Sequence, residues 1–268
     1  MRRWVAVALL FSLLGGPGCA GAQGAPDRTA PGASPFPPDT RKVVLLVIDR
    51  LSVDDLTADP EPVAALRGLA ERGGIGLMNV RTAAQANSRN GYLTVGTGVR
   101  SEAGAWAGFA FHVGERFRGH AAGDVYRSLT GTSPQFEIVH LGIGEMRRLA
   151  SFADRMPVPG ALGDLLRGAG KRVSVYGNGD VQGEERRYAA LIGMDTLGLV
   201  DAGEIGSGLL LVDPSWPGLQ RTDYDKLADR VHGAVERDDF VVVDLADLAR
   251  LDELGGQVDP GWYGAARK

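Results

Sequence analysis

The sequence predicts an α/β fold, with a doubly wound, mostly parallel sheet and helices on both faces. Three apolar runs, at residues 43–48, 172–176 and 240–243, have the length and continuous hydrophobicity of strands buried in a parallel sheet. Segments between them repeat apolar residues at helical spacing, as crossover helices between parallel strands do. No internal repeat or second hydrophobic domain is visible, so one domain is expected.

The composition supports a folded domain and excludes some partners. Of 268 residues, 44% are hydrophobic, which is enough for a substantial core. The net charge is -4 and no basic cluster is present, so a nucleic-acid partner is not expected. Cys19 is the single cysteine, which excludes an intrachain disulfide.

The first residues predict export, with a signal over residues 1–22. Arg2 and Arg3 precede an apolar stretch at 5–14 that is too short to span a bilayer. Two sites of signal cleavage are possible. Cys19 fits the lipidated first residue of a bacterial lipoprotein, although Gly16 stands where Leu is usual, and a small-x-small cut before Gln23 is the alternative. We expect either a lipid-anchored envelope protein or an extracellular or periplasmic one.

A flexible linker and one α/β domain are expected to follow the signal. Residues 23–41 are rich in Pro, Gly, Ala and Ser and show no periodicity, which is typical of a tether. The domain is expected over 42–268.

The domain begins with the apolar run 43–48, which predicts a buried strand that ends at Asp49. A helix is then expected, with Asp59 as N-cap, Pro60 in its first turn and an apolar stripe from Val63. Gly73 and Gly74 end this helix, and a second strand is expected over 75–80.

The segment 87–98 is the strongest candidate for a site. Asn87 and Ser88 precede a run that can form a short helix, and Gly96-Thr97-Gly98 closes it. Ser88 is expected in the first turn, where unpaired N–H groups and the helix dipole favour an oxyanion. The same environment favours the ionised hydroxyl that a serine nucleophile needs.

The middle of the domain is less regular. The aromatic residues Trp106, Phe109, Phe111 and Phe117 indicate either a loop at the rim of the site or a hydrophobic packing loop. Residues 136–141 predict a strand.

The second half again alternates helices and strands. Helices are expected over 161–169, ended by Gly170, over 186–192, and from a capping-box-like start at Thr222 and Asp225. A short strand is expected at 209–212. Asp180 follows strand 172–176 in a turn, either as a turn residue or as a metal ligand.

Asp49 after the first strand, followed by Asn-Ser-x-x-Gly-x-x-x-x-Gly-x-Gly at 87–98, resembles the alkaline phosphatase superfamily. The nearest branches are the cofactor-independent phosphoglycerate mutases and the nucleotide phosphodiesterases, with sulfatases more distant. The resemblance is specific over residues 42–104. It implies an alkaline-phosphatase-like core and a site with two divalent metal ions, for which Zn or Mn is expected.

Carried over residue by residue, the resemblance makes Asp49 a metal ligand and Ser88 the nucleophile that also touches that metal. Asn87, Arg89 and Asn90 are expected to bind the phosphoryl group of a substrate. A strand-end turn for Asp49 and helix capping for the others are the alternatives.

The remaining superfamily ligands, Asp-x-x-x-His, Asp-His and a last His, are not evident. Asp244 and Asp247 stand where the first of these motifs is expected and can supply carboxylates; solvated acids are the alternative. The four histidines are His112, His120, His140 and His232, and none follows an Asp directly. His140 is expected in the core, and His112 and His120 are the better ligand candidates.

The sequence ends just after Asp259 and Pro260 start a helix. Since members of this superfamily continue with further β-α units, we expect an N-terminal portion of a longer protein or a truncated reading frame. A complete but degenerate homologue is the alternative.

The expected function is an exported, metal-dependent hydrolase or phosphotransferase that acts on small phosphate or sulfate esters through Ser88. The competing expectation is a catalytically inactive, envelope-anchored homologue or fragment that acts as a binding or structural protein. An α/β-hydrolase with a Gly-x-Ser-x-Gly elbow is excluded, because Asn87 and Arg89 flank Ser88.

Overall fold

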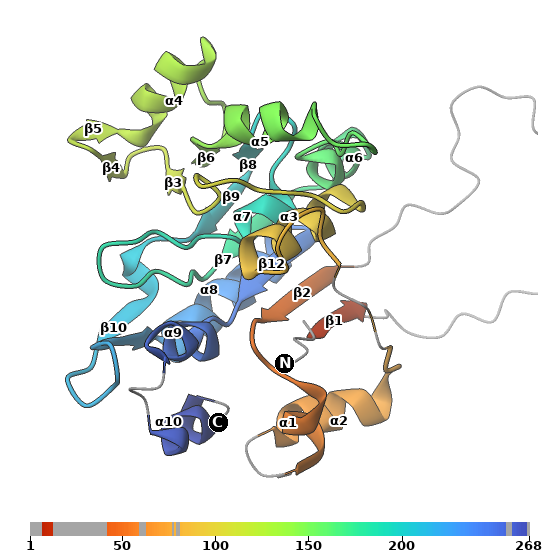
Figure 1. Ribbon diagram of the computed structural model, residues 1–268, viewed down its shortest axis with the longest axis vertical. Coiled ribbons are helices and arrows are strands. Elements are labelled where there is room, and N and C mark those ends of the chain that lie inside the picture. The colour runs from red at the N-terminus through yellow and green to blue at the C-terminus, as the bar shows by residue number, and fades with distance from the viewer. Residues whose placement is uncertain are drawn as a thin grey trace, which may run out of the picture.

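A five-stranded sheet is the centre of the fold (Figure 1). The computed structural model describes residues 7–12, 42–58, 63–76, 78, 81–255 and 259–266. The order of the sheet is β1-β2-β12-β7-β9, with bounds Val7–Ser12, Val43–Ile48, Phe240–Asp244, Val173–Tyr176 and Ala202–Glu204. The last four strands are parallel and β1 is antiparallel to β2. The prediction of an α/β fold with a parallel sheet is therefore confirmed.

The edge strand β1 consists of residues that the sequence assigns to the export signal. In the structure it pairs with β2 along its whole length, with Val7 opposite Ile48. Cys19 and the linker 23–41 lie outside the described residues. Export and lipidation stay predictions.

Helices connect the strands of this sheet. The described helices are α1 (Val53–Ala58), α2 (Ala64–Arg72), α3 (Ser88–Thr97), α4 (Ala122–Thr130), α5 (Ile143–Ala150), α6 (Ala161–Gly168), α7 (Ala190–Gly193), the 3-10 helix η1 (Ser207–Leu209), α8 (Tyr224–Arg237), α9 (Asp247–Glu253) and α10 (Pro260–Ala266). None of those in the described part of the chain combines the length and the apolar character that crossing a bilayer needs.

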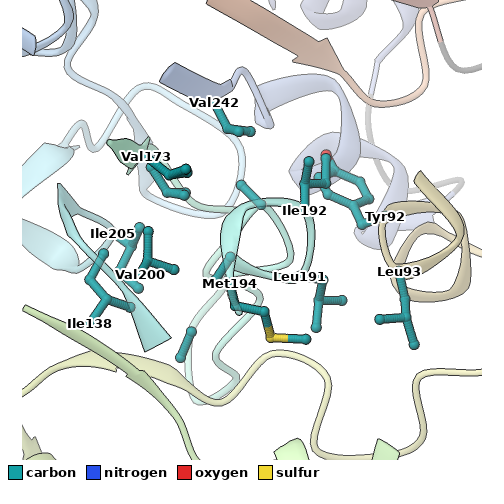
Figure 2. Close-up of a cluster of buried hydrophobic side chains, with 14 of the residues drawn as sticks. Tyr92, Leu93, Ile138, Val173, Leu191, Ile192, Met194, Val200, Ile205 and Val242 are labelled. Carbon is teal, nitrogen blue, oxygen red and sulfur yellow. The ribbon is translucent and has the colours of Figure 1, made fainter. Parts of the chain in front are cut away.

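Apolar side chains alternate between the two faces of the central strand β12. Val242 belongs to the larger core, where it meets Tyr92 and Leu93 of α3 and Ile192 of α7 (Figure 2). Val241 and Val243, one residue to either side, pack with Leu227 and Ala234 of α8. Because successive side chains of a strand point to opposite faces, this run of valines holds helices on both sides of the sheet.

Three smaller antiparallel sheets complete the structure. Their strands are β3 (Ala110–His112), β6 (Ile138–His140) and β8 (Leu199–Val200) in one sheet, β4 (Arg116–Phe117) with β5 (His120–Ala121), and β10 (Leu210–Val212) with β11 (Gln220–Thr222). Phe111 and Phe117 are buried with Tyr126 of α4 in a second core cluster, and Phe109 packs against it. The packing interpretation of this aromatic segment is therefore the one that the structure supports.

Two predictions near the start of the domain are wrong. Ile75, Gly76 and Met78, the described members of the predicted strand 75–80, form no strand, and both large side chains are exposed. A strand needs a partner, and none of the described strands pairs with them. Helix α2 begins after Val63 as N-cap, and Asp59 and Pro60 lie outside the described residues.

Two helix starts in the second half also differ from the prediction. The helix expected over 186–192 is limited to 190–193. The predicted capping box is shifted, because Asp223 caps α8 by accepting from the Lys226 N–H at 3.1 Å, while Thr222 ends β11.

Candidate active site

Helix α3 carries Ser88 at its first position. Asn87 is the N-cap, in extended conformation, and its side-chain oxygen accepts from the Asn90 N–H at 3.0 Å. Gly98 ends the helix with a φ of 70°, a left-handed conformation that glycine adopts without strain. The local signals in the sequence therefore place Ser88 in a helical first turn, as predicted.

The position of α3 is fixed by a close crossing with α7. A Cβ atom on Gly96 would lie 2.2 Å from the carbonyl oxygen of Leu191, so only glycine permits this approach. Leu93 packs beside Leu191 in the same core cluster (Figure 2). This contact holds the N-terminal end of α3 against the carboxyl edge of the sheet.

Two carboxylates reach that edge from neighbouring parallel strands. Asp49 directly follows β2, and Asp244 is the last residue of β12. The register is fixed beside them by the Leu245 N–H, which donates to the Val47 carbonyl at 2.9 Å. Since parallel strands end at one edge, residues 195 positions apart in the chain become neighbours in the fold.

A cavity of about 200 Å³ lies at this edge. Its lining includes Asp49, Ser88 and Asp244, together with Asn87 and Arg89. The structure therefore brings together five of the seven residues that the sequence singles out.

Helix α3 touches both carboxylates through hydroxyl groups one turn apart. The side chain of Ser88 lies beside that of Asp49, and its hydroxyl acts to lower the pKa of that carboxyl. The buried Tyr92 hydroxyl, four residues further along, donates to Oδ1 of Asp244 at 2.8 Å. This i, i+4 spacing puts both hydroxyls on the same face of the helix. Ser88 thus lies beside the half-buried Asp49, one helical turn before the buried Tyr92–Asp244 pair.

Both acids are shifted toward their protonated forms. Burial raises the pKa of Asp49, while hydrogen bonding from Ser88 and the charge of Arg50 oppose that rise. Burial also raises the pKa of Asp244 to about 7; the hydrogen bond from Tyr92 opposes this, and the nearby charge of Asp49 adds to it. Two desolvated carboxyl groups this close favour a proton or a bound cation between them.

Arginines surround the entrance to this pocket. Arg89, half-buried in the first turn of α3, forms no ion pair or hydrogen bond within the described part of the chain. Arg186 also lines the pocket and is paired with Glu184 at 2.8 Å and Glu253 at 2.6 Å. Arg50 has a φ of 71°, an uncommon conformation for a residue with a side chain, and its Nε lies 3.3 Å from Asp252.

Two predicted site residues have structural partners instead. The buried Asn90 amide donates to the Gln85 carbonyl at 2.8 Å and accepts from the Ala103 N–H at 2.9 Å. Asp247 accepts from the Thr222 hydroxyl at 3.0 Å and pairs with the guanidinium of buried Arg250. Neither residue lines the pocket.

The other ligand candidates also lie outside the pocket lining. Asp180 is held by Arg187 at 3.0 Å, so the turn interpretation fits it. His140 is buried, its Nε2 lies 3.0 Å from the Ala107 carbonyl, and burial lowers its pKa to about 4. His112 and His120 do not line the pocket. Over the described ranges, no group of three or more His, Cys, Asp or Glu side chains is arranged to hold a metal ion.

Sequence reasoning missed several lining residues. Tyr92 could have been found, because it lies one helical turn after Ser88. Arg186, Tyr188 and Glu253 come from a loop and from α9, and only the tertiary structure brings them to α3.

Comparisons with protein-family models, with curated proteins and with solved structures found no match to this chain.

Proposed function

We propose that the protein is an exported, metal-dependent hydrolase or phosphotransferase of phosphate (or sulfate) esters, built on a doubly wound, alkaline-phosphatase-like core. The observation that carries the proposal is the meeting of Ser88, Asp49 and Asp244 in one pocket. A hydroxyl at a helix N-terminus, beside two carboxylates and an arginine that has no ion pair among the described residues, is an arrangement suited to phosphoryl or sulfuryl transfer.

Each residue has a chemical role in this proposal. The Ser88 oxygen attacks phosphorus and the bond to the ester oxygen breaks, so that the alcohol leaves with the proton that the serine hydroxyl loses. Asp49, beside Ser88, orients the hydroxyl. The N–H group of Gly91 makes a helical hydrogen bond to the Asn87 carbonyl. The N–H groups of Ser88 and Arg89 come earlier, in the first turn, where a helix has no carbonyl acceptor for them, so these two groups can face the phosphoryl oxygens. The guanidinium of Arg89 offsets their charge. Water then hydrolyses the phosphorylated serine, or a second alcohol accepts the group.

A divalent ion such as Zn or Mn fits part of this site. Asp49, Asp244 and the Ser88 hydroxyl provide oxygen donors at one place. Burial raises the pKa of both carboxyl groups, and a bound cation would favour their ionised forms. When bound, the ion would polarise the ester and favour the serine alkoxide. The described residues supply these three ligands and not a full two-metal set.

That shortage favours one alternative function. A protein that keeps the fold and this pocket, yet lacks a sufficient set of metal ligands, would be an inactive binding or structural homologue. The protein's metal content and its hydrolytic activity distinguish the two.

The test compares wild type with Ser88→Ala on a chromogenic phosphate ester, with metal content measured on the same samples. We expect bound Zn or Mn and a fall in kcat of roughly a thousandfold or more in Ser88→Ala. Ser128→Ala, on the exposed face of α4, is the matched control and should keep full activity. Equal rates for wild type and Ser88→Ala would remove the mechanism. Absence of both metal and activity would favour the inactive homologue.

A further inference from the structure

Large apolar side chains are exposed in the turn that joins α5 to α6. Phe152 is 78% exposed, Met156 70% and Val158 52%. Single exposed apolar residues are ordinary, but three within seven positions make a local apolar surface. We call residues 152–158 the 152–158 turn.

The backbone of this turn is held in place by hydrogen bonds. The Phe152 N–H donates to the Leu149 carbonyl at 3.2 Å, and the Met156 N–H to the Ala153 carbonyl at 3.1 Å. The Val158 carbonyl accepts from the first residue of α6 at 3.0 Å, and the prolines on either side of Val158 are buried. The apolar side chains are therefore displayed by a defined structure.

The surface beside the turn is basic. Arg147, Arg148 and Arg155 are exposed there, against two exposed acids, Asp154 and Asp164, the second of which accepts from Thr196 beside Arg147. Arg148 and Arg155 form no ion pair within the described ranges, and the Arg147 guanidinium donates to the Thr196 carbonyl. This local excess of positive charge stands out in a protein with a net charge of -4.

The turn lies away from the proposed active site. In Figure 1, α5 and α6 are at the opposite end of the view from α9 and α10. Glu253 of α9 lines the pocket, so a partner seated on the turn would leave that wall of the pocket uncovered.

We propose that the 152–158 turn and its arginines form a docking surface for an anionic lipid bilayer. Aromatic and aliphatic side chains that insert at the interface, with arginines at headgroup level, are the chemistry that such a surface requires. A second copy of the chain fits less well, since a two-fold contact through this patch would bring like charges together.

One of the two signal cleavages that the sequence predicts, at Cys19, would place the domain near a membrane. The expected linker 23–41 has 19 residues, and as a flexible coil it would span roughly 25 Å. A lipid anchor at Cys19 would keep the turn within reach of the bilayer, and two weak attachments together give stable binding.

The experiment uses the full chain carrying Cys19→Ser, which removes the lipidated residue. Co-sedimentation is measured with vesicles of phosphatidylcholine alone and with phosphatidylglycerol added. We expect binding to the anionic vesicles that falls about tenfold in Phe152→Ser/Met156→Ser. Arg148→Gln and Arg155→Gln should each weaken it about fivefold. Leu129→Ser, an equally exposed leucine on α4, is the control and should bind like the parent.

Several results would overturn the proposal. These are a parent protein that stays in the supernatant, equal sedimentation of the parent and Phe152→Ser/Met156→Ser, and equal binding to neutral and anionic vesicles. Concentration-dependent dimerisation that is lost in Phe152→Ser/Met156→Ser, without vesicle binding, would identify the surface as a self-association site instead.

Discussion

In the pocket, Asp244 is a carboxyl group that burial holds toward its protonated form. Its side chain is almost fully buried and, among the described residues, accepts a side-chain hydrogen bond only from the neutral hydroxyl of Tyr92. A group that gains a proton on folding makes stability depend on pH. The same property makes the residue a sensitive reporter of what the pocket binds.

The pH dependence of unfolding follows from this shift. The pKa of Asp244 rises from 3.8 to about 7 on folding, so its favourable contribution is complete below pH 3.8 and is lost as the pH rises through about 7. With a chelator present, the free energy of unfolding of wild type relative to Asp244→Asn should therefore fall between about pH 4 and 7. The expected change is on the order of a few kcal/mol, measured by urea titration at each pH.

Asp244→Asn is a suitable reference because its amide oxygen can still accept from Tyr92. Asp213→Asn is the control, since hydrogen bonds from Ser215 and then Arg221 lower the pKa of the Asp213 carboxyl to about 2. Its contribution to stability is therefore constant between about pH 4 and 7 and is lost only at lower pH. A difference between wild type and Asp244→Asn that does not vary with pH would contradict the account of the pocket's electrostatics.

The position of a single site residue was predictable where the local sequence pattern determines it. Asp49 ends an apolar strand and Ser88 begins a helix, so both could be assigned to one edge of the sheet. Asn90 and Asp247 carry equally suitable groups, but their side chains are bound to Gln85 and Thr222 respectively. Such choices depend on contacts that form only in the folded structure, which spacing does not specify.

At the scale of elements, the crossing of α3 and α7 positions the nucleophile. Gly96 lets the two backbones approach, so a methyl group there would have to push α3 away from Leu191. A displacement of α3 would also move Ser88, which lies two turns away on the same helix.

We therefore predict that Gly96→Ala lowers the free energy of unfolding by about 1–3 kcal/mol, although alanine is the better helix former. Gly68→Ala in α2 is the matched control. No atom lies within 4 Å of the Cβ that this change adds, so the change should stabilise the protein by about 0.5–1 kcal/mol. Chemical denaturation measures both, and a stabilised Gly96→Ala would show that α3 and α7 do not cross as described.

Elements were predictable in proportion to the strength of their local pattern. Strands β2, β7 and β12 consist mostly of apolar residues, and α6 ends before a glycine with a φ of 70°, as expected. The apolar residues at 75–80 gave the same signal without a partner strand. Helix α4 went unrecognised although Ala122, Val125, Tyr126 and Leu129 recur at helical spacing, because the glycines and aromatic residues around it indicate a loop.

At the scale of the whole molecule, strand order creates the site. Strand β12 comes last of the parallel strands in sequence, yet it lies directly beside β2, the first. That insertion puts Asp244 next to Asp49. Alternating strands and helices predict a parallel sheet but not which strands are neighbours, so the pairing of these two acids required the structure.

The central claim is that Ser88 becomes covalently phosphorylated in this pocket. The most direct measurement is mass spectrometry of the protein, acid-quenched after incubation with a phosphate ester and Mn²⁺ or Zn²⁺. The account predicts a phosphoryl group on the peptide that carries Ser88, and none on that peptide in Asp49→Asn. Hydrolysis of the ester with Ser88 unmodified at every time point, or with the phosphoryl group on another residue, would contradict it.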